Sequence, residues 1–232
     1  MKYWAWSEIR SKIEQECDLE DEDFVRRDEL LAYANEAIDE AEAEIHSLYE
    51  DYFLKKVDIA VASGNEFFAI PTIMPDIYAD KIRRLIFRQG DGTTVYTVTR
   101  LKDWKKFEQK AVSDTQNTTD VYQYFLVNST PGNPEIMLVP KARESGTLTV
   151  WYLRNANRLA ADTDICDIPE FINFIFSHMK MKVYGKEGHP GYPEALERLE
   201  TERNRMNAVL ASRVPDAENE IELDTSAYED MN

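Results

Sequence analysis

The hydrophobic positions of the first fifty residues recur at helical spacing. A short helix is predicted over about residues 7–17, because Ser7 is a good N-cap and Ile9 and Ile13 fall on one face. A longer helix is predicted from Asp28, as its cap, to about residue 52. Its apolar positions advance by three and four residues alternately, which gives a narrow seam that packs against neighbouring helices at a shallow angle. The seam consists of Leu31, Ala34, Ile38, Ala41, Ile45, Leu48 and Tyr52.

In the middle of the chain the period shortens to two. Alternating segments are separated by turn signals, of which Ser63-Gly64-Asn65 and Gly90-Asp91-Gly92 are the clearest. Strands are predicted at about 57–61, 66–70, 81–88, 93–98, 122–127, 135–139 and 146–153. A short helix is predicted at 101–109. So many short strands in roughly 100 residues favour a compact, largely antiparallel β domain.

Helical spacing returns after residue 160. Asp167, with Glu170 three residues on, resembles the start of a helix that runs to about Gly185. A last helix is predicted over 193–213, with an apolar side formed by Leu196, Leu199, Met206 and Leu210. Beyond Pro215 the chain is polar and acidic and has no helical period, so this segment is expected to be extended and unfolded in the isolated chain.

The order of these elements predicts an α+β fold. The economical packing joins the N- and C-terminal helices into one bundle, with a mostly antiparallel β domain as an insertion and an extended C-terminal arm. The predicted boundaries are 1–53 and 161–213 for the helices of the bundle, 54–160 for the inserted β-rich domain and 214–232 for the acidic arm.

The charge of the chain is distributed by segment. The 232 residues carry a formal net charge of −17. By segment the net charge is −12 for residues 1–53, +4 for 54–113, −2 for 114–213 and −7 for 214–232. This acidity argues against sequence-independent nucleic-acid binding, which depends on clustered Lys and Arg, and against an anionic membrane surface. No apolar run approaches the ~20 residues that span a bilayer, and the N-terminus lacks the apolar core of a signal peptide.

Catalytic and metal-binding patterns are weak in this sequence. Asp162, Asp164 and Asp167 are spaced loosely like a calcium loop, but the Gly and Glu that such a loop needs are missing, so capping and solvation explain them better. The three histidines, His46, His178 and His189, are isolated from each other and from both cysteines. No nucleophile elbow or phosphate-binding glycine loop is present. We therefore expect no enzyme and no cofactor.

Two features could bind a partner. The basic middle segment contains Arg83 and Arg84, which point to opposite faces of a strand, so a coherent DNA-binding stripe is disfavoured. Contact with the acidic ends of a neighbouring copy is favoured instead. Its cations are Lys81, Arg83, Arg84, Arg88, Arg100, Lys102, Lys105, Lys106 and Lys110. Trp4 and Trp6, ahead of the first helix, either fold onto that helix, which is the favoured alternative, or anchor a partner.

Several short patterns together resemble the head-to-tail adaptor, or connector, proteins of tailed double-stranded-DNA bacteriophages, especially the short-tailed ones. The resemblance covers nearly the whole chain, although each pattern is loose. The patterns are Trp6-x-x-Ile9, Asp21-Glu-Asp, the helix containing Leu31, Tyr33 and Asn35-Glu-Ala, Phe68-x-Ile-Pro71, Leu148-Thr-Val-Trp-Tyr-Leu153, Asp164 to Pro169-Glu170, and the helix 171–185 followed by Lys186-Glu-Gly-His-Pro.

The resemblance implies a virion protein, made in the host cytoplasm, that assembles into a ring of usually about twelve copies. Such a ring binds the portal of the capsid on one side and tail or nozzle proteins on the other, and double-stranded DNA passes through its channel without specific binding. The family has no catalytic residues, cofactor or membrane contact. Its docking helices correspond here to about 28–52 and 168–213, with subunit packing expected through Leu31, Ala34, Ile38, Ala41 and Ile45. Its arm, expected at the portal or an adjacent subunit, would use Asp216, Glu218, Glu220, Ile221, Glu222, Leu223, Asp224 and Tyr228.

The acidity fits such a role if acidic residues line the channel, because they would repel the DNA backbone during passage. We assign this part to residues 8–51 as a hypothesis. Two other functions stay open on the sequence: an acidic protein-interaction scaffold of another kind, and a metal-dependent hydrolase.

Overall fold

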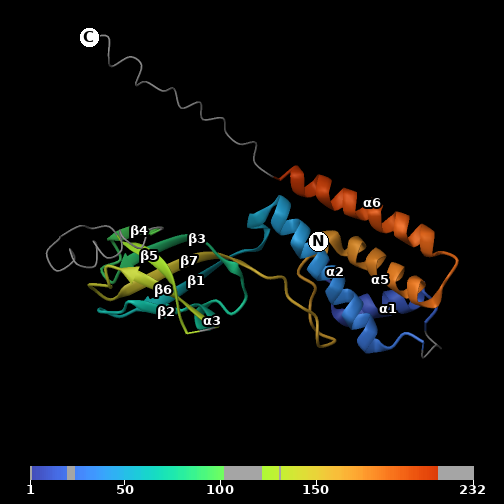
Figure 1. Ribbon diagram of the computed structural model, residues 1–232, viewed down its shortest axis with the longest axis horizontal. Helices are drawn as coiled ribbons and strands as arrows, with labels where there is room; N and C mark the ends of the chain where they lie inside the picture. Colours follow the sequence, from blue (N-terminus) through green and yellow to red (C-terminus); the bar gives the residue numbers. More distant parts are fainter. Residues whose placement is uncertain (1, 20–23, 102–121, 131, 214–232) are drawn as a thin grey trace, which may run out of the picture. The chain divides into compact units, whose positions relative to one another are not determined.

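The computed structural model describes residues 2–19, 24–101, 122–130 and 132–213 (Figure 1). The chain divides into two units. The helical unit combines residues 1–49 with the chain from Arg158 onward, and the β unit is the continuous segment 50–157. Five α-helices and a curled, mixed sheet of seven strands lie within the described residues. The predicted α+β class is therefore confirmed.

The helical unit is organised around α5 (Ile172–Glu187), which contacts α1 (Trp6–Glu16), α2 (Arg27–Leu48) and α6 (Tyr192–Ala211). The short 3₁₀ helix η2 (Pro169–Phe171) leads into α5. Half of α5 is buried, on several sides of the helix, because other helices cover it on these sides. The buried residues are Ile172, Phe174, Ile175, Phe176, Ser177, His178, Met179 and Val183.

All three predicted helix caps are wrong in position. The N-cap of α1 is Ala5, whose backbone N–H donates to the Glu8 carboxylate at 3.0 Å, so Ser7 lies inside the first turn. The N-cap of α2 is Arg26, whose backbone N–H donates to the Glu29 carboxylate at 3.0 Å, so Asp28 lies inside the first turn. The helix ends at Leu48, and the 3₁₀ helix η1 (Glu50–Phe53) continues the chain. Asp167 does not cap α5 either, because η2 intervenes and α5 begins only at Ile172. In α2 the Glu29 carboxylate, which lies within the first turn, accepts the free backbone N–H of Arg26 and takes the place of a capping side chain.

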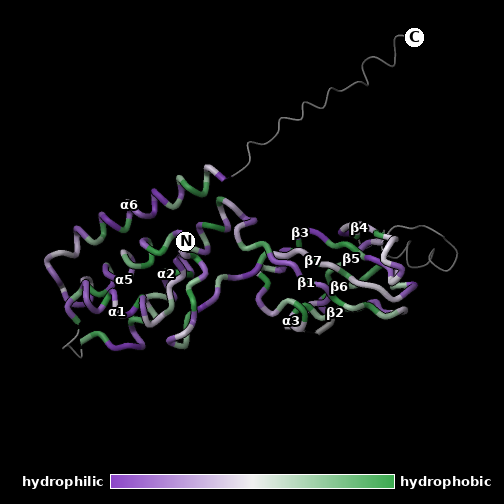
Figure 2. Tube along the Cα trace, turned by 180° about the vertical axis from the view of Figure 1, so that it is seen from behind, coloured by the Kyte–Doolittle hydropathy of each residue, from purple (hydrophilic) through white to green (hydrophobic). Residues whose placement is uncertain are grey.

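The buried sides of α2 and α6 differ from the predicted ones. Of the predicted α2 seam, Leu48 is 37% exposed and Tyr52 lies beyond the end of the helix. At one further position of α2, and at one position of α6, the neighbouring residue is buried instead. Leu30 is buried and Leu31 only half-buried, while Ala195 is buried and Leu196 is 41% exposed. Figure 2 shows hydrophobic and hydrophilic residues alternating along α6, as expected for a helix with one covered side. Apolar positions spaced every 3.5 residues shift gradually around a helix of 3.6 residues per turn. Which of two adjacent apolar residues is buried therefore depends on the helices that cover them.

The β unit contains the whole sheet, in the order β1-β7-β3-β4-β5-β6-β2. Of the six pairings, only β4 with β5 is parallel, so the sheet is mixed and mainly antiparallel. A short helix, α3 (Ile70–Ile73), follows β2. The strands are β1 (Leu54–Val61), β2 (Phe67–Ala69), β3 (Ile77–Gln89), β4 (Val95–Arg100), β5 (Gln123–Thr130), β6 (Asn133–Val139) and β7 (Gly146–Arg154). The predicted helix at 101–109 lies outside the described residues, apart from Leu101.

The core of the β unit combines aliphatic side chains with a group of aromatic rings. The ring centroid of Phe87, on β3, lies 5.1 Å from that of Tyr122, and Tyr96 on β4 lies 5.0 Å from Tyr122, both in edge-to-face arrangements. At the start of β7 the backbone approaches β3 so closely that a Cβ on Gly146 would lie 2.2 Å from the Arg88 carbonyl oxygen. Glycine is therefore required there for the β3–β7 pairing.

Candidate interaction surfaces

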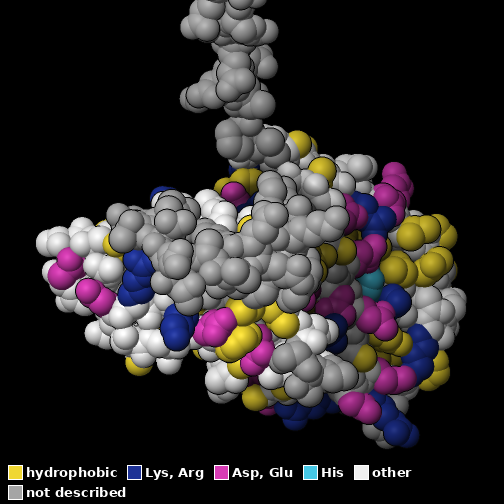
Figure 3. Space-filling model, turned by 60° about the vertical axis from the view of Figure 1, so that its left-hand side comes forward, with side chains coloured by type: hydrophobic (Ala, Val, Ile, Leu, Met, Phe, Trp, Pro, Cys, Tyr) yellow, Lys and Arg dark blue, Asp and Glu magenta, His cyan; other side chains and the backbone are white. Residues whose placement is uncertain are grey.

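Ion pairs join the acidic N-terminal helices to cations of the C-terminal helices. Three lysines of α5 each bind a carboxylate from another helix, Lys180 from α1 and Lys182 and Lys186 from α2. The pairs are Lys180 with Glu16 at 4.0 Å, Lys182 with Glu36 at 2.7 Å, and Lys186 with Glu29 at 2.7 Å. In the right-hand part of Figure 3, acidic and basic side chains lie side by side.

Arg203, on α6, is the most connected of these cations. Its guanidinium binds Glu40, contacts Glu44 at 3.1 Å and binds Glu200 at 2.8 Å, and it lies 5.9 Å from the centroid of the Phe174 ring. Its side chain is 24% exposed, so solvent screens these contacts less than on an open surface. Arg203 therefore holds α6 against α2 by charge as well as by packing.

These pairs change how the segmental charge is interpreted. The charge of −12 on residues 1–53 is not a continuous acidic surface, because part of it is matched by cations more than a hundred residues away. Counted by unit, residues 1–49 and 158–213 together carry −11, the β unit +1, and residues 214–232 carry −7. The arm thus has the highest acidic charge per residue in the protein.

The segment before η2 is fixed to α1 and α2 by its polar groups. The Asn35 side chain donates to the Leu159 carbonyl at 3.0 Å and accepts from the Leu159 N–H at 2.9 Å. Asp162 binds Arg10 at 3.0 Å and Arg27 at 2.5 Å. Asp164 accepts the N–H groups of the preceding turn, which lowers the pKa of its carboxyl. Asp162 and Asp164, two of the three carboxylates with calcium-like spacing, therefore hold this loop in place.

Trp4 and Trp6 both belong to the helical unit. Trp6 is fully buried, and its backbone N–H donates to the Asp164 carbonyl at 2.8 Å. Trp4 is half-buried and meets the Phe176 ring edge-on at a centroid distance of 5.3 Å, with the Lys2 ammonium 3.8 Å from its own ring. Trp6 is thus a core residue rather than a partner anchor, because none of its side chain is accessible to a partner.

The seam on α2 predicted for subunit packing lies inside the helical unit. Ala34, Ile38, Ala41 and Ile45 are each 0% exposed, and Leu31 is half-buried. Helices of the same chain already cover these side chains, so the surface that α2 leaves open is its opposite side. The predicted arm residues, Asp216 to Tyr228, lie outside the described residues.

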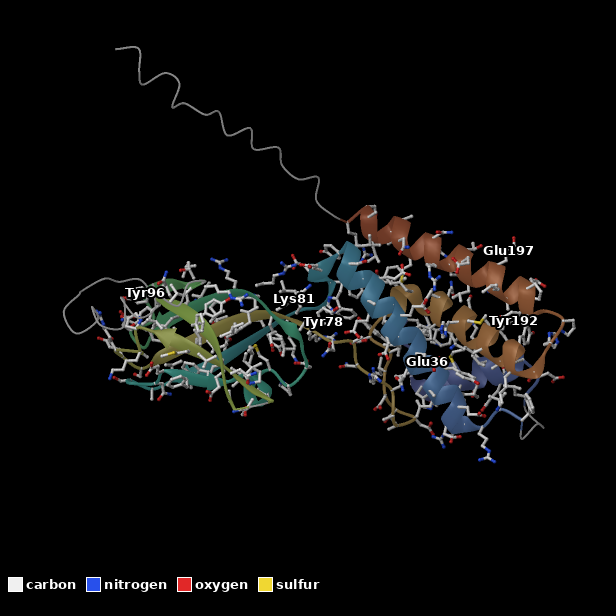
Figure 4. All side chains as sticks on the ribbon, viewed as in Figure 1. Glu36, Tyr78, Lys81, Tyr96, Tyr192 and Glu197 are labelled. Atoms are coloured by element: carbon white, nitrogen blue, oxygen red, sulfur yellow. The ribbon has the colours of Figure 1, made fainter. Side chains whose placement is uncertain are left out.

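Several basic residues of β3 are engaged within the β unit. Arg83 binds Glu50 and contacts Asp51 at 3.0 Å, and Lys81 binds Glu50 at 3.0 Å. In Figure 4 Lys81 lies beside Tyr78, and its ammonium is 5.4 Å from the Tyr78 ring centroid. Arg84 lies 5.9 Å from the Trp151 ring and lines the same hollow as Arg83 and Asp51. A β-bulge between Ile82 and Arg84 interrupts the alternation of side chains there, so the prediction that Arg83 and Arg84 lie on opposite faces is not met.

Buried titratable groups in the helical unit are kept uncharged. Burial raises the pKa of the Cys17 and Cys166 thiols to about 11, so both stay protonated near neutral pH. Burial, with a smaller contribution from Lys182, lowers the pKa of His178 to about 4. Among the described residues no group of three or more His, Cys, Asp or Glu side chains is placed to hold a metal ion. These groups serve packing in the helical unit.

The described residues thus offer ion-paired and packed surfaces in two units. The sequence profile of the SU10 adaptor protein family matches residues 5–221. The chain belongs to this family, and the match is consistent with a phage head–tail adaptor. No curated protein is significantly similar to the chain. None of the helices in the described ranges is long and apolar enough to span a membrane.

Membership in the family implies a structural adaptor role in a phage, a place in the virion, and contacts with portal and tail proteins. The profile begins one residue before α1 and ends within the acidic arm, so it spans both units. The short patterns that carried the resemblance on the sequence therefore identified the family correctly.

Proposed function

We propose that this chain forms an oligomeric ring of twelve copies that joins the capsid portal to the tail of a short-tailed phage. The ring leaves a channel through which DNA is packaged and ejected, and the protein is made in the host cytoplasm before it joins the virion. The observation that carries this proposal is the family match over residues 5–221, because it includes both units and the start of the arm.

Ring contacts require a surface that the isolated chain leaves open. On α2 the side opposite the buried seam carries three small exposed side chains, Ala32, Ala43 and Ser47, among carboxylates such as Asp28 and Glu36. Small side chains let another backbone approach closely, so this side of α2 suits the contact with a neighbouring subunit. The buried seam then has a different task, which is to fix α2 within its own unit.

The channel hypothesis takes a modified form. Residues 8–51 remain our candidate for the channel wall, although Glu16, Glu29 and Glu36 are paired with lysines of α5. The net charge of −11 on the helices of this unit still repels phosphate. DNA would pass such a wall without specific binding. An assembled ring with residues 8–51 on its outer surface would contradict this part of the proposal.

The experiment is electron microscopy and native mass measurement of the purified full-length protein, with and without a portal ring. We expect closed rings on the portal. A protein that stays a 27.0 kDa monomer in the presence of the portal refutes the proposed function. Deleting residues 215–232 should weaken portal or neighbour binding and leave the folded units intact.

A matched pair of variants tests the subunit contact. Ala43→Arg places a long side chain on the exposed side of α2 and should lower the yield of rings. Thr201→Arg makes the same kind of change on the exposed side of α6 and should leave ring formation unchanged. Equal effects of the two variants would show that this side of α2 is not the contact.

A further inference from the structure

One edge of the sheet has no partner strand among the described residues. β1 is the first strand in the sheet order and pairs only with β7, in antiparallel register from Leu54 opposite Leu153 to Val61 opposite Gly146. Leu54 is 44% exposed, and the burial of β1 alternates along its length. An edge of this length presents a row of backbone N–H and C=O groups that another strand can pair with.

The two faces of β1 differ in chemistry. On the inner face Val57 and Ile59 pack against the core of the β unit but remain only partly buried. On the outer face Lys56 lies 5.8 Å from the Trp151 ring, and Asp58 accepts a hydrogen bond of 2.6 Å from the Thr149 hydroxyl. A strand added beside β1 would therefore meet an apolar inner side and a polar outer side.

The outer face around β1 has a surplus of positive charge. Register places Lys56 and Arg84 on either side of Trp151, and Asp58 and Arg88 in the following rows. Asp58 forms an ion pair with Lys56 at 3.0 Å. In the part of the chain that the structure describes, Arg84 and Arg88 have no carboxylate within ion-pair distance. These three cations and one carboxylate sum to +2, and the paired Arg83 and Asp51, which line the same hollow as Arg84, leave that sum unchanged.

The acidic arm has the complementary pattern. From residue 216 to residue 224 every even position is acidic, as Asp216, Glu218, Glu220, Glu222 and Asp224. The odd positions between them are Ala217, Asn219, Ile221 and Leu223. In an extended strand side chains alternate between faces, so this segment would have one wholly acidic face and one face that is mainly small or apolar.

We propose that residues 216–224 of one copy add as a strand to the β1 edge of a second copy. Ile221 and Leu223 would then extend the apolar inner side over Val57 and Ile59, while the acidic face would lie on the outer side toward Lys56, Arg84 and Arg88. Backbone hydrogen bonds supply the pairing and the alternating side chains set its register. Side chains of an extended arm alternate every two residues, as they do in β1, so the two segments can pair in register. Side chains of a helical arm would not follow this alternation.

Charge and apolar pattern together favour a protein segment over DNA at this edge. DNA would be attracted by Arg84 and Arg88 but would leave Val57 and Ile59 uncovered. The proposal rests on the proposed ring, because a closed ring supplies one arm for each β1 edge.

The test uses the full-length chain as acceptor, with Ile221→Ser and Leu223→Ser in its own arm so that this arm cannot occupy the edge. The probe is a synthetic peptide of residues 214–232. Amide hydrogen exchange should show protection of alternate β1 amides, those that point away from β7, when the peptide binds. A peptide with Glu220→Lys, Glu222→Lys and Asp224→Lys should bind at least about tenfold more weakly.

Charge exchange provides the decisive control. An acceptor with Lys56→Glu, Arg84→Glu and Arg88→Glu should lose the acidic peptide and gain the lysine peptide, which a loss of folding could not produce. An acceptor with Arg205→Glu alone, changed on exposed α6, should bind both peptides as the unchanged acceptor does.

The inference would be overturned if the peptide bound without protecting the β1 amides, or if its binding were unaffected by the charge exchange. Displacement of the peptide by duplex DNA would also overturn it. So would protection of β1 by a chain's own arm in a dilute monomer. Portal assembly is scored separately. If rings form on the portal while β1 stays unprotected, the strand addition is wrong and the proposed function stands. If no ring forms, the proposed function fails whatever the peptide does.

Discussion

The two units of this protein are held together in different ways. The β unit is one continuous segment of the chain, and its core consists of neighbouring strands with aromatic and branched side chains. The helical unit combines two segments that are separated by the whole β unit. Its interior is apolar around α5, and its margin is joined by ion pairs between α1 or α2 and the C-terminal helices.

The difference shows what an inserted domain demands of its host. The pairings of the β unit all close within one continuous segment, the longest of them from Leu54 to Leu153, whereas the helical unit must bring together two segments with that whole segment between them. Acidic residues in the first segment and lysines or arginines facing them in the second favour the correct pairing of those segments. The charge pattern therefore contributes to specificity within the chain, besides any role at an interface.

The largest expected effect comes from separating the units. Residues 50–157 expressed alone should keep a cooperatively unfolding sheet, because all strand pairings of the β unit lie within that segment. Residues 158–213 alone should lose most of their helix, because α5 depends on α1 and α2 for cover. Circular dichroism and thermal unfolding check both fragments. A cooperatively folded 158–213 fragment would remove the contrast between the units.

Among the single substitutions in the helical unit, Trp6→Ala should lower the free energy of unfolding most. Removing a fully buried indole leaves a cavity, and such substitutions cost about 3–5 kcal/mol. Trp4→Ala, at a half-buried ring, is the matched control and should cost clearly less. Chemical denaturation should show the loss in the helical transition, while the β transition keeps its midpoint. A shift of both transitions together would mean that the units do not unfold separately.

Acid should weaken the helical unit through His178. Its Nε2 lies 3.3 Å from the Glu40 carboxylate, with Glu36, Lys182 and Arg203 nearby, and burial lowers its pKa to about 4 from an ordinary value near 6.5. The unfolded chain therefore takes up a proton at higher pH than the folded chain. The stability that neutral, buried His178 contributes is complete above about pH 6.5. As the pH falls from there to about 4, the free energy of unfolding should decrease by at most about 3 kcal/mol.

Stability measured between pH 7 and pH 4 checks this prediction. His178→Leu should flatten the fall across that range, whereas His189→Gln, at an exposed ring, should leave it in place. An unchanged slope in the His178→Leu variant would show that other groups cause the acid sensitivity.

The smallest effect is expected from the ion pairs themselves. Arg203→Met keeps the stem of the side chain but leaves Glu40, Glu44 and Glu200 without their shared cation, and should cost about 1–2 kcal/mol. Arg205→Met, two residues along α6 and 68% exposed, should cost less than about 0.5 kcal/mol. Denaturation in low and high salt measures both. Equal costs would show that the Arg203 contacts do not stabilise the pairing of the segments.

Much of the fold could be predicted because local periods decide it. The strands, the turns at Gly64 and Gly90–Gly92, and the helices appear where periods of two and of three to four residues place them. The caps could not be predicted at Asp28 and Asp167, because Glu29 and the 3₁₀ turn before Ile172 compete for the same N–H groups. For the interaction surfaces the sequence indicated the family, but it placed the subunit contact on the side of α2 that its own chain covers.

By itself the sequence determined the α+β class, the strand and helix periods, the acidic arm and the family, because each depends on residues close together in the chain. Only the tertiary structure decided which carboxylates of the N-terminal segment are matched by cations, and that Trp6 and the α2 seam lie in the core. It also decided that β1 is an edge with an apolar inner face and a basic outer one. These are properties of residues that are distant in sequence and adjacent in space, and a linear pattern records no such distances.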